Sequence, residues 1–454
     1  MSPSRLSALD AAFLSLERSH APMHVGWAAL FAPRGDGSRP SFEQVREHIE
    51  SRLHLAPRYR QRLAEVPLGL GDPVWIDETH FDITRHVRRA EHGAFGRLVD
   101  EVLSTPLEHG RPLWELWVAE ETNDGYIGVV GKAHHCLVDG LAAVELMALL
   151  LDATPDPEPV ADPGWRPRTT PSAAQLVGEA VRHDVGQALE LATLPLRWAR
   201  DPHELRGVAD QTWRAARHLA RTVASPAPPS RLNGAMPATR HLAWHSRPMD
   251  DLTTIKRRFA TTVNDILLTA SSGALCRLAG ARGELPDVVK AMVPVSVEAP
   301  DENWGNRIAF LFVELPCEEN DPVWRLRDIH VTMRDRKRDG EPEGADAVLN
   351  AVSYAPRSVR RLASRLIASP VLSNLTISNI PGPQMPVYLM GCEVEHAYPV
   401  VPLTDRHGMS IGMTTIHGRA CFGVYAQAEF AQDADRIAHG IAEEIDALLE
   451  RTAA

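Results

Sequence analysis

The sequence predicts an α/β fold made of two lobes with a long connection between them, and three observations lead to this prediction. The chain has 454 residues, which is more than a single hydrophobic core usually supports. Segments with strand-like and helix-like hydrophobic periods alternate in both halves of the chain. Two proline-rich stretches, 154–171 and 225–234, interrupt this alternation near the middle. We therefore expect one lobe at 1–171, a helical and proline-rich linker at 172–236, and a second lobe at 237–454.

The first lobe carries strands and helices in alternation. HVGWAALF (24–31) predicts a strand, and SFEQVREHIESRLHL (41–55) predicts a helix that begins after an N-cap serine. GYIGVVGKAHH (125–135) is apolar and β-branched, which is typical of a buried strand. GLAAVELMALLLDA (140–153) is apolar nearly all round, which is typical of a deeply buried helix.

The linker and the second lobe continue this pattern. Residues 172–224 are rich in Ala and Arg and predict helices. The strand candidates of the second lobe are, in order, VVKAMVPVSV (288–297), NRIAFLFVEL (306–315), NLTISNI (374–380) and HGMSIGMTTIHGRACFGVYA (407–426). Because clefts between domains are favoured ligand sites, we expect a ligand to bind between the lobes.

Composition and charge exclude several classes of protein. An apolar fraction of 44% excludes wholesale disorder. The net charge of −11 argues against nucleic acid as a partner, because phosphate binding needs a basic surface. The five cysteines are scattered without a CxxC pair, which favours reduced thiols in the cytoplasm. The first residues lack a signal-peptide pattern, and no stretch approaches the ~18 apolar residues of a spanning helix. We therefore expect a cytoplasmic protein that is at most peripheral to a membrane.

The segment GKAHHCLVDG (131–140) places polar groups at the end of the predicted buried strand. A metal site is disfavoured there, because successive strand side chains point to opposite faces and His134 and His135 cannot both reach one ion. No HExxH motif or cysteine cluster indicates a metal elsewhere, and we expect none. A structural interpretation makes both histidines core residues and Asp139 a helix cap. It leaves unexplained two imidazoles that need partners for their nitrogens, and a glycine, Gly140, at a helix start.

A catalytic interpretation uses the same alternation of side chains. One histidine points into the cleft, and the other packs behind it and supports the turn. An ordinary histidine pKa of ~6.5 allows proton removal near neutral pH. The sequence has no GxSxG elbow, and Cys136 faces away from His135 on a strand, so no serine or cysteine nucleophile is expected. A base without a protein nucleophile implies that the substrate supplies the nucleophile, as in direct acyl transfer.

The run His134-His135-Cys-Leu-Val-Asp139-Gly140 matches HHxxxDG. Through it the chain resembles the CoA-dependent acyltransferase superfamily, which includes chloramphenicol acetyltransferases and peptide-synthetase condensation domains. Within that superfamily, the chain resembles the bacterial wax ester synthase/diacylglycerol acyltransferase family along nearly its whole length. The matching stretches are, in order, LSALDAAFLSLE, PMHVG, FDITRHVR, PLWE, VNDILL, VPVSV, the pair Gly305-Asn306, and SNIPGP. Ordered matches in both halves are far more specific than the HHxxxDG box alone.

The resemblance implies a fold, a reaction and roles for the box. It implies two chloramphenicol-acetyltransferase-like lobes that form a pseudo-dimer with the active site at their interface. It implies that His135 is the general base, that His134 supports it, and that Asp139 holds the turn. Gly140 leaves room for substrate or backbone to approach closely. The acyl donor is then acyl-CoA, used as a co-substrate with no permanently bound cofactor. The acceptor is the hydroxyl of diacylglycerol, giving triacylglycerol, or of a long-chain alcohol, giving a wax ester.

Further candidate substrate-binding or channel residues lie outside the box. They are Trp114, Asn264, Asp265, Asn306, Ser378 and Asn379. Each has a structural alternative. Trp114 is favoured as a packing residue, and Asp265 matches a capping-box spacing with Thr262. Asn264 is either a donor to the developing oxyanion or part of that helix start. Ser378 and Asn379 precede a turn rich in proline and border the channel in relatives.

Two alternatives to this function and one question of location stay open. The same fold acylates another hydroxyl, such as a sterol, a polyketide alcohol or a glycolipid, or the chain is an inactive relative that binds acyl-CoA or lipid. Residues 213–223 and 356–369 form basic amphipathic patterns that suit a lipid interface, and peripheral contact with a membrane or lipid droplet fits lipid substrates. We favour the simpler interpretation, in which each helix packs on its own protein with a solvated charged face. The sequence indicates no protein partner.

Overall fold

The computed structural model describes most of the chain. The described residues are 4–91, 94–138, 149–158, 164–200, 202–283, 288–297, 307–317, 320–353 and 355–452. Asp139, Gly140 and Asn306 lie outside the described residues, as does most of the predicted helix at 140–153.

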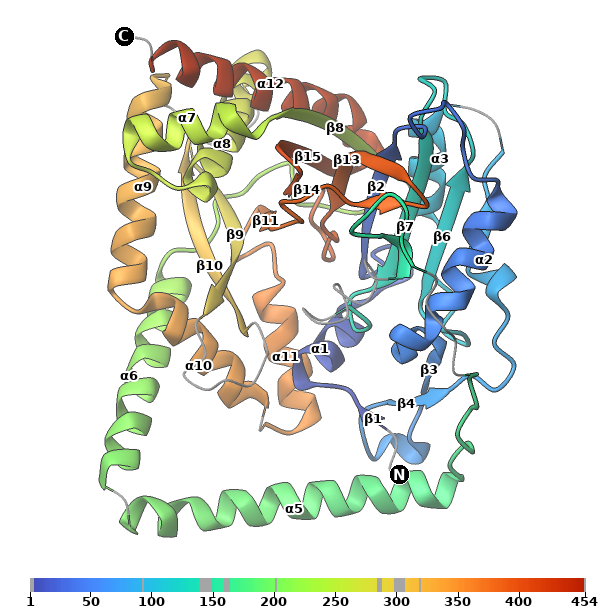
Figure 1. Ribbon diagram of the computed structural model, residues 1–454. Helices are drawn as coiled ribbons and strands as arrows, with labels where there is room; N and C mark the ends of the chain where they lie inside the picture. Colours follow the sequence, from blue (N-terminus) through green and yellow to red (C-terminus); the bar gives the residue numbers. More distant parts are fainter. Residues whose placement is uncertain are drawn as a thin grey trace.

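Two six-stranded sheets form the centre of the molecule (Figure 1). The sheet of the N-terminal half has the order β12-β13-β2-β7-β6-β5. Its strands are β2 (His24–Phe31), β5 (Val87–Arg89), β6 (Trp114–Ala119), β7 (Ile127–His134), β12 (Tyr388–Leu389) and β13 (Cys392–Val400). Every residue of β7 is buried, as expected for a central strand. The predicted strand at 24–31 is therefore observed at its predicted bounds, and that at 125–135 at slightly shorter ones.

Helices and a small sheet complete this half. The helices are α1 (Ala8–Leu16), α2 (Phe42–Arg52) and α3 (Phe95–Ser104). The small sheet has the order β1-β4-β3, from β1 (Ser4–Arg5), β3 (Gln61–Ala64) and β4 (Val74–Asp77). Short 3₁₀ helices are η1 (Leu53–Leu55), η2 (Pro57–Arg60), η3 (Pro67–Gly69) and η4 (Ile83–Arg85). Helix α2 begins as predicted, because Ser41 and Gln44 form a reciprocal capping box.

The sheet of the C-terminal half has the order β10-β9-β11-β14-β15-β8. Its strands are β8 (Arg240–Pro248), β9 (Val288–Val297), β10 (Arg307–Pro316), β11 (Leu375–Ile380), β14 (Met409–Ile416) and β15 (Arg419–Gln427). The accompanying helices are α7 (Met249–Phe259), α8 (Val263–Arg282), α9 (Pro322–Arg338), α10 (Glu341–Ser353), α11 (Arg357–Ile367), the 3₁₀ helix η5 (Ala428–Phe430) and α12 (Ala431–Glu450). The run predicted as strand at 407–426 is a hairpin, because His417 and Gly418 take positive φ angles and turn the chain.

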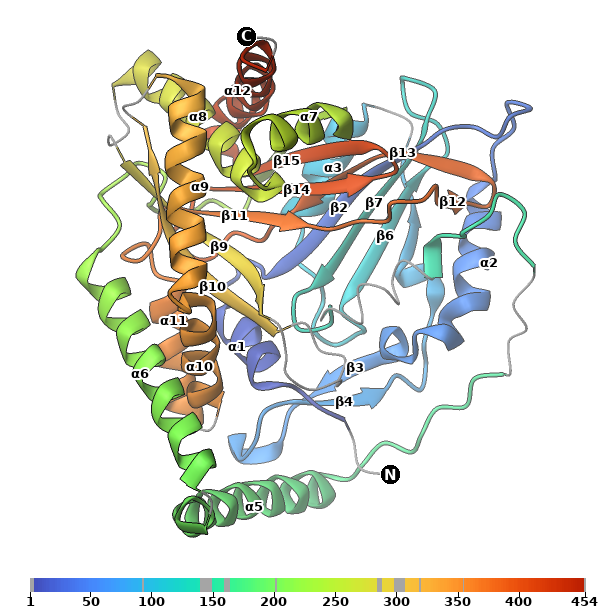
Figure 2. The same cartoon turned by 60° about the vertical axis from the view of Figure 1, so that its left-hand side comes forward.

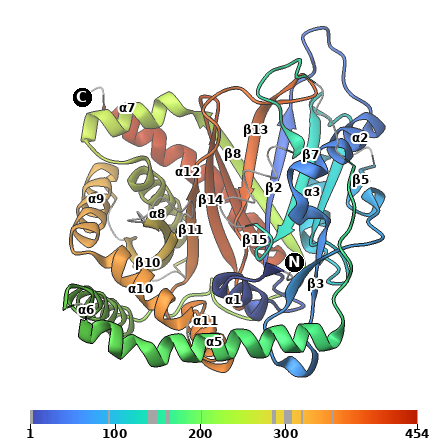
Figure 3. The same ribbon diagram turned by 60° about the horizontal axis from the view of Figure 1, so that its bottom comes forward.

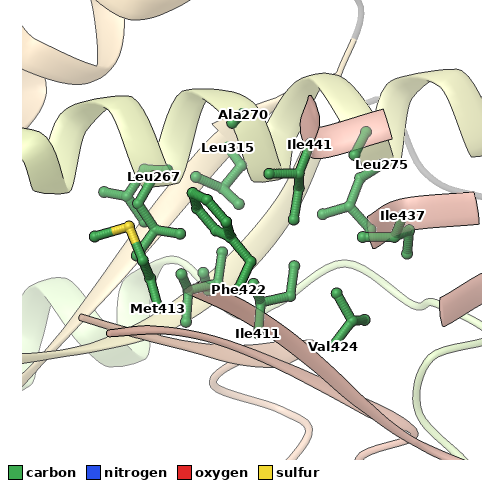
Figure 4. Close-up of a cluster of buried hydrophobic side chains, with 14 of the residues drawn as sticks. Leu267, Ala270, Leu275, Leu315, Ile411, Met413, Phe422, Val424, Ile437 and Ile441 are labelled. Atoms are coloured by element: carbon green, nitrogen blue, oxygen red, sulfur yellow. The ribbon is translucent and has the colours of Figure 1, made fainter. Parts of the chain in front are cut away.

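The core of this half lies between the sheet and two helices. Figure 4 shows apolar side chains of α8 and α12 meeting those of β14 and β15. Leu267 and Ile441 approach from the two helices, and Ile411 and Phe422 approach from the sheet; all four are fully buried. This packing holds the C-terminal sheet as a rigid wall for the space between the halves.

The connection between the halves is helical, as predicted for 172–224. Helices α5 (Ala173–Arg200) and α6 (Pro202–Ala224) run along one side of the molecule from the N-terminal to the C-terminal half (Figures 1 and 2). The first turns of α5 pack on β4, where Leu176 and Ala180 join the cluster of Val66 and Val74. At its other end, α6 packs along α10.

Strand β13 crosses from one half of the chain into the sheet of the other. It pairs antiparallel with β2 over Val394–Val400, while it also contacts β14 and β15 of the C-terminal sheet. Its neighbour β12 extends the same N-terminal sheet. The predicted boundary at 237 therefore does not separate the two sheets completely, since residues 388–400 belong structurally to the first.

Both basic amphipathic segments are helices, and their arginines divide between ion pairs and solvent. In α6, Arg217 and Arg221 pair with Asp339, while Trp213 is 70% exposed. In α11, Arg357 and Arg360 bind Asp72, and the exposed apolar residues are Val359, Leu362 and Leu366. Arg214, Arg221, Arg361 and Arg365 are nonetheless exposed, so the charged faces stay largely solvated, as in the favoured interpretation, although apolar side chains of both helices are exposed as well.

Candidate active site

The turn after β7 carries the two histidines and is held by backbone hydrogen bonds. The His134 N–H donates to the carbonyl of Leu113 at 2.9 Å, and the His135 N–H donates to the carbonyl of Met23 at 2.8 Å. The Leu137 N–H then closes the turn on the His134 carbonyl at 2.8 Å. Because these bonds come from two neighbouring segments, the position of His135 is fixed by the sheet rather than by a free loop.

His135 lines a cavity of about 460 Å³ between the two sheets. The cavity lies between the two halves of the chain, where a ligand is expected from the sequence. Apolar side chains of α1, β2, β13 and the C-terminal sheet form most of its wall, and they include Leu9, Phe13, Trp27, Phe31, Met292, Phe310, Ile380, Ala397, Val401 and Ile416. Such a wall suits a hydrocarbon chain, with a small number of polar groups for orientation.

The environment of the His135 ring keeps it neutral. Its ring stacks on Phe13 of α1, with centroids 3.6 Å apart and planes inclined by 20°. Its Nδ1 is buried and has no hydrogen-bond partner among the described residues. Burial lowers the pKa of His135 to about 4, and the nearby His134 ring adds to this effect. The neutral imidazole required of a general base is therefore the dominant form near neutral pH.

His134 is fully buried behind His135 and meets a carboxylate. Its Nδ1 accepts a hydrogen bond from the backbone N–H of Cys136 at 3.1 Å, and its Nε2 faces Glu17 Oε1 at 3.6 Å. The other carboxylate oxygen of Glu17 lies 2.6 Å from His109 Nε2. Sequence reasoning missed Glu17 and His109. Glu17 lies in the matched stretch LSLE near the start of the chain, and nothing near His109 indicates a role.

The contacts around His134 shift the pKa values of Glu17, His109 and His24. Burial opposes the Glu17 carboxylate, yet its close contact with His109 and the nearby His134 ring hold the pKa of Glu17 well below its ordinary value. The same contact raises the pKa of His109. His24 lies at the other side of His134, and burial, with the nearby Lys132 charge, lowers its pKa to about 3. His24 is therefore neutral, and its Nε2 accepts the backbone N–H of Leu107 at 3.2 Å.

The hydroxyl side chains that line the cavity are few. They are Ser364, Thr376, Ser378, Thr404 and Thr414. The hydroxyls of Ser364, Thr404 and Thr414 are already bonded to protein groups. Thr376 and Ser378 have no such bond within the described part of the chain, and they lie two residues apart on one face of β11. Ser378 is thus a polar group available to a ligand on the sheet opposite His135.

The other candidates from the sequence lie away from the cavity wall. Trp114 is buried in the N-terminal core, where its Nε1–H donates to the Tyr59 carbonyl at 2.8 Å. Asp265 caps α8 with Thr262, as its spacing predicts, and accepts from His330 at 2.8 Å. Asn264 and Asn379 are half-buried and are not among the cavity-lining residues. None of these four residues lines the cavity. Trp114 packs and Asp265 caps a helix, as their structural alternatives predict, and a binding role for Asn264 and Asn379 stays a prediction.

Comparison with known proteins decides the family. The sequence profile of the wax ester synthase/diacylglycerol acyltransferase catalytic domain matches residues 6–267, and that of the WS/DGAT C-terminal domain matches residues 304–449. The chain belongs to the wax ester synthase/diacylglycerol acyltransferase family. It is an acyl-CoA-dependent O-acyltransferase of that family, and the resemblance stated from the sequence is confirmed.

Relatives and solved structures agree with this assignment along the whole chain. A protein of Mycobacterium tuberculosis strain CDC 1551 named as a diacylglycerol O-acyltransferase is 30% identical, over 98% of this chain and 90% of its own. The wax ester synthase/diacylglycerol acyltransferase of Marinobacter aquaeolei VT8 superposes with a TM-score of 0.71 at 22% identity, covering 100% of both chains. A starter condensation domain of rhizomide synthetase, solved with C8-CoA and Leu-SNAC, gives 0.59 at 12% identity, covering 100% of this chain and 95% of its own. The predicted acyltransferase fold is thus confirmed.

In the part of the chain that the structure describes, no group of three or more His, Cys, Asp or Glu side chains is arranged to hold a metal ion. Within the same ranges, no helix has the length and apolar character to cross a bilayer.

Proposed function

We propose that this member of the family transfers a long-chain acyl group from acyl-CoA to the hydroxyl of diacylglycerol, with His135 as the general base. The observation that carries the proposal is the neutral imidazole of His135 on the wall of an apolar cavity between the two sheets. Diacylglycerol is preferred as acceptor because relatives similar over nearly the whole chain are named for it. A long-chain alcohol is the second candidate, since the Marinobacter protein carries both names.

The reaction follows from a base with no protein nucleophile beside it. His135 removes the proton of the acceptor hydroxyl, and the oxygen attacks the thioester carbonyl carbon. The tetrahedral intermediate collapses with cleavage of the carbon–sulfur bond, and the CoA thiolate leaves with the proton that His135 returns. Ser378 faces the cavity with an unbonded hydroxyl, so it is the candidate donor to the oxygen that becomes negative. Binding both substrates in one cavity removes much of the entropic barrier to their encounter.

The acceptor is tested directly with purified protein. Thiol release from palmitoyl-CoA is measured with diacylglycerol, hexadecanol, a sterol and no acceptor, and the products are separated by chromatography. The proposal predicts thiol release coupled to triacylglycerol, with hexadecanol giving palmityl palmitate at a lower rate. Thiol release that is coupled to product with the sterol alone would show that the acceptor is a sterol and not diacylglycerol. Tight binding of palmitoyl-CoA without any thiol release would identify an inactive binder and contradict the proposal.

A lipid substrate raises the question of where the protein meets lipid, and one surface suits an anionic bilayer. Helix α11 exposes Leu362 (70%) with Val359 and Leu366, while Ile367 of the same helix lines the cavity. Exposed apolar side chains gathered at a cavity mouth indicate a binding surface rather than chance exposure. Arg361 and Arg365 flank this apolar face, are exposed, and have no acidic partner among the described residues.

Neighbouring segments extend the same surface. Arg357 donates to the Gly69 carbonyl of the turn that presents Leu68, which is 91% exposed and has a positive φ angle. Gly71 lies against Ala180 of α5, and the next turns of α5 expose Val181, Val185 and Leu189. Figure 3 shows α5 and α11 on the same side of the molecule. We define the docking face as Leu68, Val181, Val185, Leu189, Val359, Leu362 and Leu366, together with Arg361 and Arg365.

Flotation with lipid vesicles tests the docking face. The protein is expected to float with vesicles that contain phosphatidylglycerol and much less with pure phosphatidylcholine, because the arginines need anionic headgroups. The double variant Leu362→Glu/Leu366→Glu is expected to lose flotation while it still acylates dispersed dioctanoylglycerol. Val331→Glu, on the exposed side of α9, serves as the matched control. Equal flotation of the double variant and the control would rule out this face as the site of contact.

A further inference from the structure

The two histidines of the turn are both contacted by α1. Phe13 stacks on the ring of His135, and Glu17, four residues later, faces the ring of His134. Residues four apart lie on one face of a helix, and the Glu17 N–H donates to the Phe13 carbonyl at 3.3 Å where α1 ends. The helix therefore places one apolar and one charged side chain against consecutive members of the catalytic box.

Hydrogen bonding defines the tautomer of His134. A backbone N–H can only donate, so the His134 Nδ1 that accepts from Cys136 at 3.1 Å carries no proton. The proton of the neutral ring is then on Nε2, which is fully buried and has no hydrogen-bond partner within the described ranges. Glu17 Oε1 lies 3.6 Å from this nitrogen. The carboxylate thus stands where it stabilises an Nε2–H ring, as the acidic member of a catalytic triad does for its histidine.

A change of tautomer would disturb the turn. If Nδ1 carried the proton, it would meet the Cys136 N–H donor to donor, and the turn that begins at the His134 carbonyl would have to shift. His135 lies within that turn, and its ring is positioned by a stack on Phe13. A displacement of even about 1 Å at a reacting group can cost roughly 10²-fold in rate.

His109 holds Glu17 in place. Its Nε2 lies 2.6 Å from Glu17 Oε2, and the pair is half-shielded from solvent. His109 also lines a second cavity, on the far side of α1 from the acyl cavity, together with Glu65, Asp72, Arg357, Arg360 and Arg361. Within that wall, Asp72 is already engaged by Arg357 and Arg360. Among the described residues, the other titratable groups that interact with the Glu17–His109 pair are Glu65, His134 and His24, and Lys132 acts on His24.

We propose that Glu17 and His109 are positioning residues, which fix His134 as its Nε2–H tautomer and through the turn fix His135 for acyl transfer. Neither residue touches the reacting atoms, and the inference rests on the proposed role of His135. It assigns a function to a half-buried carboxylate that takes no direct part in the proposed reaction. If the Glu17–His109 pair served only stability, it would not need to lie against His134, the first histidine of the box.

The kinetic test compares His109→Leu, His109→Gln and Glu17→Ala with His439→Leu, which breaks an exposed histidine–carboxylate pair of 3.2 Å on α12. His109→Leu and Glu17→Ala are expected to lower kcat by at least ~10-fold with KM nearly unchanged, as outer-shell partners do. His109→Gln keeps a donor to Glu17 and is expected to recover most of the loss.

A second readout does not need turnover. Nitrogen-15 spectra of histidine-labelled protein report the His134 tautomer, with the resonance assigned by its absence in His134→Gln. The wild type is expected to show the Nε2–H form, and Glu17→Ala is expected to show a mixture. An Nδ1–H form in the wild type, or an unchanged ring in Glu17→Ala, would overturn the inference. Wild-type kcat in both His109→Leu and Glu17→Ala of an active enzyme would also overturn it, whereas absence of transfer by the wild type would count against the proposed function alone.

Discussion

His134 and His135 are neighbours in the sequence, yet the geometry of the strand end gives them opposite surroundings. His135 lies against an apolar cavity, while His134 lies against a carboxylate. Burial alone suffices to keep the first ring neutral, and a charge is needed to orient the second. The residue-level account is therefore one of divided roles, in which one imidazole exchanges a proton with substrate and the other holds the turn.

The low pKa of His135 has a direct consequence for pH dependence. A histidine with an ordinary pKa would lose its basic form as pH falls through ~6.5. Because the pKa of His135 is lowered to about 4, the basic form persists and is lost only as pH falls through that region. We expect kcat to stay nearly constant from pH 7 to about pH 5 and to fall below it. A titration of kcat at saturating palmitoyl-CoA checks this, and a midpoint near pH 6.5 would show that the ring is solvated during turnover.

Ser378 and Asn379 are separated by their places on β11. Only Ser378 lines the cavity, so Ser378→Ala is expected to lower kcat by roughly 10–10²-fold through loss of a donor to the oxyanion. Asn379→Ala, one residue away, is the control and should leave kcat within about twofold. Steady-state kcat values of both variants are measured with diacylglycerol. A larger loss of kcat in Asn379→Ala than in Ser378→Ala would assign the donor role to Asn379.

At the same scale, the sequence identifies residues of local motifs and misses residues brought in from afar. The HHxxxDG run and its place at a strand end are visible in ten consecutive letters. Glu17 and His109 come from other segments. Glu17 ends the matched stretch LSALDAAFLSLE, which does not reveal its contact with the box, and His109 carries no local pattern. Trp114 shows the converse, since it belongs to a matched motif but its indole is used for packing.

At the scale of elements, helix starts are where sequence and structure agree most closely. Ser41 caps α2 and Thr262 caps α8, each through a side chain that accepts from the third residue of the helix. Sequence-based expectation and structure differ in the pairing of strands. The segment 392–400 alternates weakly and contains Pro399, so nothing local indicates that it joins β2 of the other half. Such pairing depends on complementary partners far along the chain.

The structural role of Asp265 gives a prediction for α8. Its carboxylate accepts from the Thr262 N–H at 2.9 Å and pairs with His330 at 2.8 Å in a buried position. Asp265→Ala is expected to lower the free energy of unfolding by about 1–3 kcal/mol, because it removes the cap and leaves the Thr262 N–H and the His330 ring without this acceptor. Asn264→Ala is the neighbouring control, and urea unfolding measures both. A folded and equally stable Asp265→Ala enzyme that lacks activity would instead support a direct role in the reaction.

At the scale of the whole molecule, the two sheets are joined by close backbone contact. Gly412 of β14 and Gly423 of β15 are paired across the C-terminal sheet, and both lie against Pro399 of β13. A Cβ at position 423 would approach the Pro399 carbonyl oxygen to 2.2 Å. Absence of side chains at this point lets β13 lie on the C-terminal sheet while it pairs with β2. The cavity and both halves of the site depend on that spacing.

Gly423→Ala tests this contact. The added methyl group is expected to separate β13 from β15 and to lower the free energy of unfolding by about 1–3 kcal/mol, as overpacking does. Activity should fall as well, since Pro399 and Val400 line the cavity. Gly35→Ala, which meets no atom within 4 Å, is the control. Thermal unfolding and transfer rate are measured together, and unchanged values for Gly423→Ala would mean that the sheets can adjust their separation freely.

One measurement tests the central claim most directly: formation of radiolabelled triacylglycerol from labelled palmitoyl-CoA and diacylglycerol by His135→Ala. His439→Ala, at an exposed position of α12, is the matched control, and circular dichroism verifies that both variants are folded. The account predicts that His135→Ala loses at least ~10²-fold in rate while the control stays at the wild-type level. Transfer by folded His135→Ala at the wild-type rate would show that this imidazole is not the base.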